Sequence, residues 1–516
     1  MNDVCLLLEG TYPYVAGGVS TWVYELIRRL DDITFSIVYL GPHRLATRKL
    51  HYEIPDNVLD FRELYLFDYQ LAREKTRRKK PGDVDRLLEF LMQVKRGRTE
   101  LFGEAVRILG GKDERTISLH DLAYSREGWE LVRKLYESEN EQVSFVDYFW
   151  TWRFLFLPFF SLLRVELPPA RIYHSISTGY AGALGSLAKL KTGRPLLLTE
   201  HGIYTRERKI EISKADWIYS KTAYEMKVTE RADFFREWWI ALFSFLSRLT
   251  YESADEIITL YEGNRRVQIE EGADPRKIGI IPNGIDFSFM SRLKKDSGRS
   301  RFGIGFVGRV VPIKDVKTFI KACRKICDEL ENVDIYIIGP TDEDETYYRD
   351  CLFLVEMEGL RDVIRFTGKV KMADFYPKLD VVVLTSVSEA QPIVILEALA
   401  CGIPCVTTDV GACPELLRGR TSEDCELGAA GYVTPICDPD ATAKAIIEIL
   451  KNPGLRRKMA EAGRKRIEKF YQIDDMIADY QMLYNRHIEE VSAGAKARED
   501  GTVSAGSGEG DAGWRG

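Results

Sequence analysis

The sequence predicts an α/β fold with two Rossmann-like domains. Short apolar, β-branched segments alternate with segments of helical pattern along most of the chain, which is typical of parallel α/β architecture. Some apolar segments are nearly continuous, as in Val381 to Leu384, and this indicates strands that are covered on both faces. At 516 residues the chain is also long enough for two large domains.

Candidate strands form one series in each half of the chain. The first series is predicted at residues 4–8, 35–39, 171–174, 195–199, 256–259 and 277–281. The second is predicted at residues 303–307, 334–338, 363–366, 380–384, 404–407 and 431–434. We therefore expect an N-terminal domain over residues 1–285 and a C-terminal domain over residues 301–470.

The segments between and after these series differ in composition. Residues 286–300 are polar and charged, as a linker should be. Residues from about 60 to 170 interrupt the first series and predict a helical insertion. We expect a C-terminal helix over 471–490 that returns to the N-terminal domain. Residues 491–516 hold almost no large apolar side chain, so we expect this tail to be disordered.

Charge and targeting patterns narrow the class of protein. The net charge of −6 disfavours a nucleic-acid partner. Residues 145–163 are apolar enough to suggest a membrane span, but Asp147, Arg153 and Pro158 favour a core or partner-docking helix. No signal peptide is visible, and the nine cysteines are expected to be buried, reduced thiols. We expect a cytoplasmic protein, with a peripheral place at the inner membrane through a protein complex as the alternative.

The most specific motif is SEAQPIVILE, residues 388–397, which follows the predicted strand at 380–384 and opens a helix. Pro392 suits the first turn of that helix, where its missing N–H group costs nothing. The free amides near Ile393 then face the carboxyl edge of the sheet, where α/β proteins bind ligands. The motif therefore predicts a ligand site at this edge.

Two carboxylates frame this motif. Glu397 shares a helical face with Ile393 and Val394, and a carboxylate there needs a partner because burial without one is expensive. The vicinal hydroxyls of a ribose could satisfy it; a structural arginine or an exposed edge is the alternative. Glu389 precedes the helix and stands at the mouth of the predicted crevice. Taken alone, Glu389 only complements the helix dipole.

Two cations follow the strand predicted at 303–307. Arg309 and Lys314 lie in the loop of FVGRVVPIKD, at the carboxyl end of that strand. The planar fork of an arginine and the point charge of a lysine suit a diphosphate. A pair of surface cations is the alternative.

Two loops in the N-terminal half also follow predicted strands. Gly17 and Gly18 lie in EGTYPYVAGGV, where two successive glycines permit close approach of the backbone to a ligand. Their spacing is not G-x-G-x-x-G, so a dinucleotide is disfavoured. His201 lies in TEHGIYTRER. A lone histidine is more often structural, but a position at the carboxyl end of a strand favours a functional role.

Together these motifs resemble the retaining GT-B glycosyltransferases of family four, over about residues 1–490. The resemblance implies that Glu389 contacts hydroxyls of the donor sugar and that Glu397 holds the ribose. It further implies that Arg309 and Lys314 neutralise the leaving pyrophosphate, and that His201 lies against the donor sugar. By the same resemblance, the catalytic residues are Glu389, His201, Arg309 and Lys314.

The resemblance also implies a nucleotide-sugar site. Its expected residues are Gly17, Gly18, Arg309, Lys314, Lys369, Glu389, Gln391, Pro392, Ile393 and Glu397. Lys369 lies at the edge where a uracil base is expected. Ala390 and Gln391 depart from the glycine and the aromatic or aliphatic residue that are common in the family, so Gln391 could bond a sugar hydroxyl. A front-face displacement with net retention and without a metal ion is what the family implies.

Three motifs are most similar in sequence to glycosyltransferases of bacterial Pel exopolysaccharide systems. They are TEHGIYTRER, FVGRVVPIKDVKTFI and SEAQPIVILEALACGIPCVTTDVG. This similarity implies a UDP-hexose or UDP-N-acetylhexosamine donor, an oligo- or polysaccharide acceptor, and partners in an inner-membrane Pel export complex. We expect no cofactor, no metal and no nucleic acid. Two alternatives stay open: a UDP-sugar epimerase of the same fold, and a nucleotide-sugar-binding scaffold docked to a membrane complex through residues 145–163.

Overall fold

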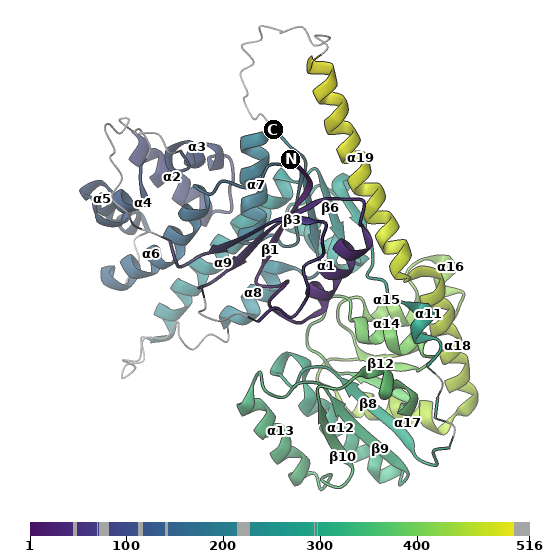
Figure 1. The fold of residues 1–516 in the computed structure, drawn as a ribbon. Helices are drawn as coiled ribbons and strands as arrows, with labels where there is room; N and C mark the ends of the chain where they lie inside the picture. Colours follow the sequence, from purple (N-terminus) through teal and green to yellow (C-terminus); the bar gives the residue numbers. More distant parts are fainter. Residues whose placement is uncertain are drawn as a thin grey trace. The chain divides into compact units, whose positions relative to one another are not determined.

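The protein folds into two compact units (Figure 1). The computed structural model describes residues 1–44, 49–69, 71, 82–111, 117–139, 143–213, 228–293, 295–296 and 298–499. The N-terminal unit comprises Met1–Thr259, Arg265–Gly279 and the chain from Tyr480, and the C-terminal unit comprises Leu260–Asn264 and Ile280–Asp479. All the strands that the sequence predicts are present, so the fold is α/β with two Rossmann-like units.

The N-terminal unit contains a seven-stranded sheet within the described residues. Its strands, in sheet order, are β3 (Val58–Tyr65), β2 (Phe35–Gly41), β1 (Asn2–Glu9), β4 (Ala170–Ser175), β5 (Leu196–Glu200), β6 (Glu256–Thr259) and β7 (Ile278–Ile280). The helices that follow its strands are α1 (Gly18–Arg29), α7 (Tyr180–Thr192), α8 (Tyr204–Ser213), α9 (Val228–Ser253) and α10 (Glu262–Glu270). The strand order reverses between β1 and β4, which opens a crevice at their carboxyl ends.

Strand β3 corrects the predicted start of the insertion. Residues 60–65 belong to β3, which pairs with β2 at the edge of the sheet. Its sequence VLDFRELY mixes apolar and charged residues instead of forming an apolar run, because none of the residues of this edge strand is fully buried. The insertion therefore begins after this strand. Its helices are α2 (Asp83–Lys95), α3 (Phe102–Leu109), α4 (Leu119–Tyr124), α5 (Arg126–Glu139) and α6 (Phe145–Leu162).

Helix α6 covers the apolar segment that the sequence singled out. One side of it, including Trp152, Phe156 and Phe159, is buried in the core of the N-terminal unit. The prediction of a core helix is thus confirmed, although Trp150 stands 61% exposed on its other side. No helix in the described part of the chain has the length and apolar character that crossing a membrane requires.

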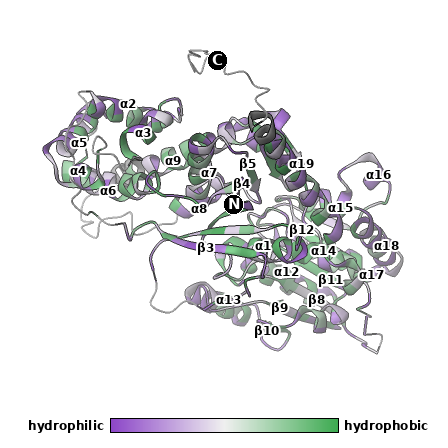
Figure 2. Ribbon diagram, turned by 45° about the horizontal axis from the view of Figure 1, so that its top comes forward, coloured by the Kyte–Doolittle hydropathy of each residue, from purple (hydrophilic) through white to green (hydrophobic). Residues whose placement is uncertain are grey.

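The C-terminal unit contains a parallel sheet of six strands within its described residues. In sheet order they are β10 (Ile364–Gly368), β9 (Val333–Ile338), β8 (Phe302–Val307), β11 (Val381–Leu384), β12 (Cys405–Thr408) and β13 (Gly431–Thr434). Its helices are α11 (Phe287–Met290), α12 (Val316–Glu329), α13 (Glu345–Met357), α14 (Ile393–Ala400), α15 (Cys413–Arg418), α16 (Ser422–Cys425), α17 (Pro439–Lys451) and α18 (Pro453–Phe470). In Figure 2 the strands of this sheet are mostly green, the hydrophobic end of the scale.

Both faces of this sheet are covered, as the apolar runs predict. Val381 and Val383 pack into one core, together with side chains of α12 and α17. Val382 and Leu384 point the other way, into a second core with α14 and α15. Because successive residues of a strand face opposite sides, a strand buried on both faces needs an unbroken apolar sequence.

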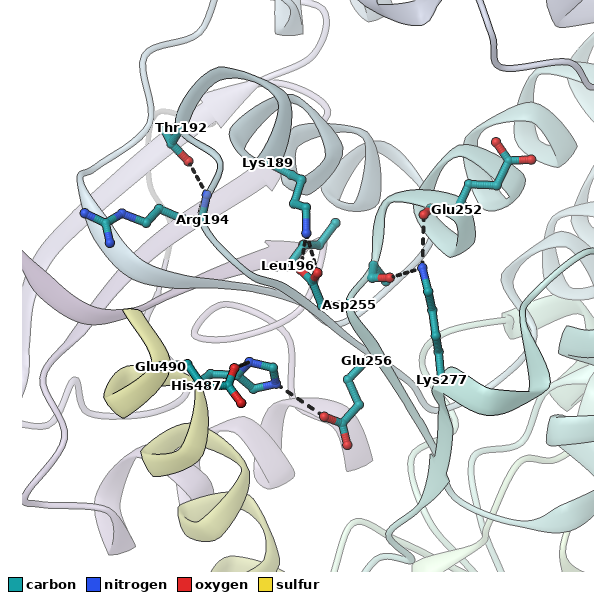
Figure 3. A network of polar contacts seen from close by, with 11 residues as sticks. Lys189, Thr192, Arg194, Leu196, Glu252, Asp255, Glu256, Lys277, His487 and Glu490 are labelled. Carbon is teal, nitrogen blue, oxygen red and sulfur yellow. Dashed lines mark hydrogen bonds and ion pairs between the residues drawn. The ribbon is translucent and has the colours of Figure 1, made fainter. Parts of the chain in front are cut away.

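The last helix, α19 (Ile473–Glu499), enters the N-terminal unit at Tyr480. There Tyr484 Oη lies 2.7 Å from Nδ1 of His174. His487 Nε2 lies 3.3 Å from Oε2 of Glu256, as Figure 3 shows. The predicted disorder of the tail is wrong for residues 491–499, which continue the helix. Alanine, lysine, arginine and glutamate in this stretch are strong helix formers, which favours continuation of the helix. Residues 500–516 lie outside the described residues.

The cysteines are all free, as expected, but they are not all buried. Cys5, Cys323, Cys351, Cys405 and Cys413 are buried, and Cys327 and Cys401 are half-buried. Cys425 and Cys437 are exposed, because they lie in the loops and short helix around α16 and β13 instead of in apolar strands or helix faces. The expectation of buried thiols is wrong for these two.

Candidate functional site

The strand order of the C-terminal sheet reverses between β8 and β11, and this brings together the two loops that carry the FVGRVVPIKD and SEAQPIVILE motifs. The strand order turns at β8 and β11, so the loops that follow these two neighbouring strands lie side by side at their carboxyl ends. Val387 N donates a hydrogen bond of 2.9 Å to the carbonyl of Ile313, and Thr385 Oγ1 donates one of 2.8 Å to the carbonyl of Asp315. The loop after β11 is thereby fastened to the loop after β8.

This contact joins two of the predicted site residues. The ammonium group of Lys314, at the end of the 3₁₀ turn Pro312–Lys314, forms an ion pair with Oε1 of Glu389. The hydroxyl of Ser386 donates a hydrogen bond of 2.6 Å to the same oxygen. The side chain of Lys314 is 20% exposed and that of Glu389 is 11% exposed, so a ligand can reach both. A cation and an anion thus lie next to each other beyond the carboxyl ends of β8 and β11.

A glycine on the neighbouring loop fixes the backbone of Glu389. Gly411 has φ of +54°, and a Cβ atom there would lie 2.2 Å from the carbonyl oxygen of Ala390. Ala412 N donates a hydrogen bond of 2.7 Å to that same carbonyl. The backbone just after Glu389 is therefore held by the loop after β12, and this close approach requires a residue without a side chain at position 411.

Helix α14 presents its amino end beside these residues. Pro392 occupies the N-cap position, one residue before the predicted first turn. The amides of Ile393 and Val394, at the first two helical positions, have no acceptor in the part of the chain that the structure describes. Gln391 is buried, and its Oε1 accepts a hydrogen bond of 2.6 Å from Asn283 N. Its amide nitrogen donates no hydrogen bond to a described residue.

Glu397 has a partner that the sequence did not reveal. The hydroxyl of Tyr376, a fully buried residue, donates a hydrogen bond of 2.6 Å to Oε2 of Glu397. Oε1 accepts no hydrogen bond from any described residue. Burial raises the pKa of Glu397, and the hydrogen bond from Tyr376 lowers it in part. One carboxylate oxygen is therefore anchored, while the other is free for a hydroxyl donor.

Arg309 and Lys369 lie apart from this pair. The guanidinium of Arg309 is about half exposed, and its Nη1 lies 2.5 Å from Oε2 of Glu343, which is on the loop after β9. Lys369 is exposed just beyond the end of β10 and contacts neither Lys314 nor Glu389. The structure thus brings Lys314 and Glu389 together, but it does not bring either of these two cations to them.

The N-terminal unit holds the other predicted residues. Gly17 and Gly18 are exposed at the start of α1, and a Cβ atom on Gly17 would meet nothing within 4 Å. His201 is buried just after β5, where the centre of its ring lies 4.7 Å from that of Trp22 in an edge-to-face arrangement. Burial lowers the pKa of His201 to about 4, so the imidazole is neutral at neutral pH.

Sequence reasoning missed two carboxylates at strand ends in this unit. Glu9, at the end of β1, accepts hydrogen bonds of 2.7 Å from Tyr204 Oη and 3.1 Å from Ala181 N. Glu200, at the end of β5, is fully buried and accepts from Gln268 Nε2 at 2.8 Å and from Tyr251 Oη at 2.7 Å. Burial raises the pKa of Glu200 to about 7. An acidic residue ending an apolar strand is the pattern that could have identified both.

Two families match the chain, one in each half. Residues 2–276 match the family described as a domain of unknown function (DUF3492), which covers more than half of the chain. Residues 291–466 match the family described as glycosyl transferases group 1. The second match covers the loops that carry Lys314, Glu389 and Glu397.

Curated relatives match parts of the chain. The D-inositol 3-phosphate glycosyltransferase of Kineococcus radiotolerans is 29% identical over 240 residues, which are 42% of this chain and 54% of that protein. The N-acetyl-alpha-D-glucosaminyl L-malate synthase of Bacillus anthracis is 28% identical over 248 residues, which are 46% of this chain and 61% of that protein. The chain spans between half and two thirds of the length of these relatives.

Solved structures resemble the whole fold. Sucrose-phosphate synthase from Thermosynechococcus elongatus has a TM-score of 0.55 at 16% identity, with 94% of this chain and 98% of that chain covered. HepE of Anabaena, solved in complex with UDP and glucose, has a TM-score of 0.55 at 14% identity, with 94% and 100% covered. At these identities the likeness establishes the fold alone.

Proposed function

We propose that this chain, which belongs to the family of the domain of unknown function DUF3492 and is a group 1 glycosyltransferase of the GT-B fold, transfers a hexose or N-acetylhexosamine from a UDP-sugar with retention of anomeric configuration. The observation that carries the proposal is the Lys314–Glu389 pair in the crevice between β8 and β11. The C-terminal unit, with residues 301–470, binds the donor in this account, and the N-terminal unit binds the acceptor.

The donor phosphates would take over the contact that Lys314 now makes with Glu389. Lys314 then faces the diphosphate, and the free amides of Ile393 and Val394 add hydrogen-bond donors at the positive end of α14. These groups stabilise the negative charge that grows on the leaving UDP as the glycosidic bond breaks. Arg309 joins them by leaving Glu343, which is an exposed partner and therefore holds it weakly. This cationic set is our reason to propose catalysis without a metal ion.

The carboxylates position the donor in the same account. Glu389, released from Lys314, accepts hydrogen bonds from hydroxyls of the sugar. The free Oε1 of Glu397 accepts from the ribose, while Tyr376 holds the other oxygen in place. Glu389 is committed to the sugar, and we therefore propose a front-face displacement, in which the departing phosphate accepts the proton of the acceptor hydroxyl. His201, neutral at neutral pH, serves as a hydrogen-bonding group for the donor sugar.

The acceptor in this proposal is a growing exopolysaccharide of the Pel type. This proposal is supported by the amino-acid sequences of the three motifs, which are similar to those of PelF, a cytosolic glycosyltransferase of Pel systems. We propose a cytoplasmic location and a place at the inner membrane through proteins of a Pel export complex. The exposed aromatic side chains Trp150 and Phe154 on α6 offer such proteins a contact surface.

Product analysis tests this function against its main alternative. Purified protein is incubated with each of a panel of UDP-sugars, with and without oligosaccharide acceptors, and the products are followed by NMR of the anomeric protons. The proposal predicts that UDP is released and an α-linked product forms from an α-linked donor only when an acceptor is present. Interconversion of UDP-sugars without an acceptor would instead identify an epimerase. An inverted product would overturn the retaining mechanism.

A further inference from the structure

A second cavity lies in the C-terminal unit at the opposite edge of the sheet from Glu389. It has a volume of about 270 Å³, many times the roughly 10–15 Å³ that a single water molecule needs. Asp380 and Pro404, which line it, stand just before the amino ends of β11 and β12. The cavity is therefore separate from the crevice at the carboxyl ends of the strands.

The charged side chains around this cavity are mostly cationic. Lys295, Arg456 and Arg457 line it together with a single carboxylate, that of Asp380. Asp380 is buried and already paired with Lys295, and its Oδ2 accepts a hydrogen bond of 2.9 Å from Gly303 N. Three positive charges against one negative charge leave a surplus of two positive charges, so the lining suits a dianion.

Arg456 has a buried N–H group that the protein does not satisfy, whereas Arg457 reaches the same cavity with a solvent-exposed side chain. Arg457 makes no hydrogen bond or ion pair with any described residue. Nη1 of Arg456 is buried without a hydrogen-bond acceptor, and the nearest carboxylate oxygen, Oδ1 of Asp380, is 3.9 Å away. Because a buried guanidinium N–H without an acceptor is costly, its presence beside a cavity points to an acceptor supplied by a ligand.

The position of these arginines on their helix supports the same conclusion. Both lie in the first two turns of α18, near its positive end, and the first turn holds no acidic residue. Cations at this end of a helix are unfavourable, because they add to the positive charge of the helix dipole. An anion bound between the arginines and the helix end removes this repulsion.

We propose that this cavity binds a small phosphorylated metabolite, with its phosphate held by Arg456 and Arg457. A phosphate monoester carries a charge of about −1.5 to −2 at neutral pH, which matches the surplus of the lining. The planar fork of an arginine fits phosphate oxygens in a bidentate way. The remaining walls, which include Tyr376, Pro377 and Pro453, leave room for a small organic group. The argument for this site does not rest on the proposed transfer reaction, although the two sites share Tyr376, whose hydroxyl bonds to Glu397.

Isothermal titration calorimetry of the full chain tests this site. The probes are inorganic phosphate, a hexose 6-phosphate and the uncharged hexose, each titrated with UDP in excess so that phosphate cannot occupy the crevice around Lys314. The titrations are repeated on Lys314→Gln, whose crevice has lost its cation, so that the result stands even if UDP does not bind. The matched variants are Arg457→Gln and Lys458→Gln, neighbouring exposed cations on α18 of which only Arg457 lines the cavity.

The hexose 6-phosphate is expected to bind the wild-type chain, Lys314→Gln and Lys458→Gln with similar affinity, while the uncharged hexose does not bind. Arg457→Gln should weaken the binding about tenfold or more, the usual effect of losing one charged hydrogen-bond donor. Equal affinity for inorganic phosphate would place the recognition in the phosphate group alone and still support the site. Absence of binding by either phosphate probe, or an affinity that Arg457→Gln leaves unchanged, would overturn the proposal.

Discussion

The ammonium group of Lys314 forms an ion pair with Oε1 of Glu389, across the point where the C-terminal sheet reverses its strand order. The two residues are 75 positions apart in the sequence and come from the loops after β8 and β11. Each holds the other in place, and both side chains stay partly exposed. In our account, the donor exchanges this pair for two new contacts, phosphate with Lys314 and sugar hydroxyls with Glu389.

Replacement of Glu389 separates sugar positioning from nucleotide binding. Glu389→Ala should reduce turnover by about 100-fold or more, the loss typical of removing one positioned catalytic contact. UDP affinity should be retained, because Lys314 then has no competing carboxylate. Steady-state kinetics and calorimetric titration with UDP measure the two effects, and Glu356→Ala, on the exposed side of α13, is the control. Near wild-type turnover of Glu389→Ala would remove this residue from the mechanism.

Replacement of Lys314 should have the opposite effect on nucleotide binding. Lys314→Met removes the cation that faces the diphosphate and leaves Glu389 as an unpaired anion at the same place, so UDP affinity should fall by about 10- to 100-fold. Arg309→Gln is the comparison, and its effect should be smaller because Arg309 lies about half exposed against Glu343. Calorimetric titration with UDP decides between them. Equal UDP affinity of Lys314→Met and wild type would contradict the placement of the phosphates.

The contact between Gly411 and the backbone beside Glu389 can be tested by comparing Gly411→Ala with Gly359→Ala. Gly411→Ala places a Cβ atom against the carbonyl of Ala390 at a positive φ, whereas Gly359→Ala meets the same backbone penalty with nothing within 4 Å. Gly359→Ala should cost about 1 kcal/mol of unfolding free energy, and Gly411→Ala about 1–3 kcal/mol more. Denaturant unfolding measures the costs. Turnover should fall only in Gly411→Ala, since only that change moves Glu389.

The buried carboxyl of Glu200 makes the stability of the protein depend on pH. Its folded pKa of about 7 lies above the ordinary value of 4.5, mainly because burial disfavours the charged form. The folded state therefore holds the proton more tightly, and this contribution is fully present below about pH 4.5 and is lost as the pH rises through about 7. The loss amounts to ~3 kcal/mol.

The comparison with Glu200→Gln isolates this contribution. The unfolding free energy of the wild type, relative to that of Glu200→Gln, should decrease as the pH rises from 4.5 to 7, because glutamine does not titrate. Denaturant melts at several pH values measure it. His201 titrates with the opposite sign in both proteins and cancels in the difference. A difference that stays constant with pH would show that folding does not shift the pKa of Glu200, and would contradict the prediction.

The sequence predicted the fold well where burial leaves a periodic pattern. The run Val381 to Leu384 is apolar at every position because both of its faces are covered, and this revealed a central strand. Strand β3 escaped notice because charged residues interrupt its apolar sequence, which an edge strand that is only partly buried allows. The end of α19 was missed because a composition poor in large apolar residues does not separate a disordered tail from a helix made of strong helix formers.

The candidate site was predicted only in part, because some of its contacts join residues that lie far apart in the sequence. Lys314 and Glu389 were each recognisable from their place after a strand, and the topology of a parallel sheet brings such loops together. Tyr376 and Asn283 gave no such indication. They meet Glu397 and Gln391 through side-chain contacts that depend on the packing of the 3₁₀ turn Tyr376–Lys378 and of the segment after β7. Neither contact leaves a local pattern in the sequence.

The most direct test of the donor site is a thermal-shift titration of the purified chain with UDP, GDP, ADP and a panel of UDP-sugars. A ligand at about 100 times its dissociation constant stabilises the folded state by about 2.7 kcal/mol, which is readily measured as a higher Tm. The account predicts that UDP and one or two UDP-sugars raise the Tm, and that this increase is strongly reduced in Lys314→Met. The absence of a shift with every nucleotide would contradict it.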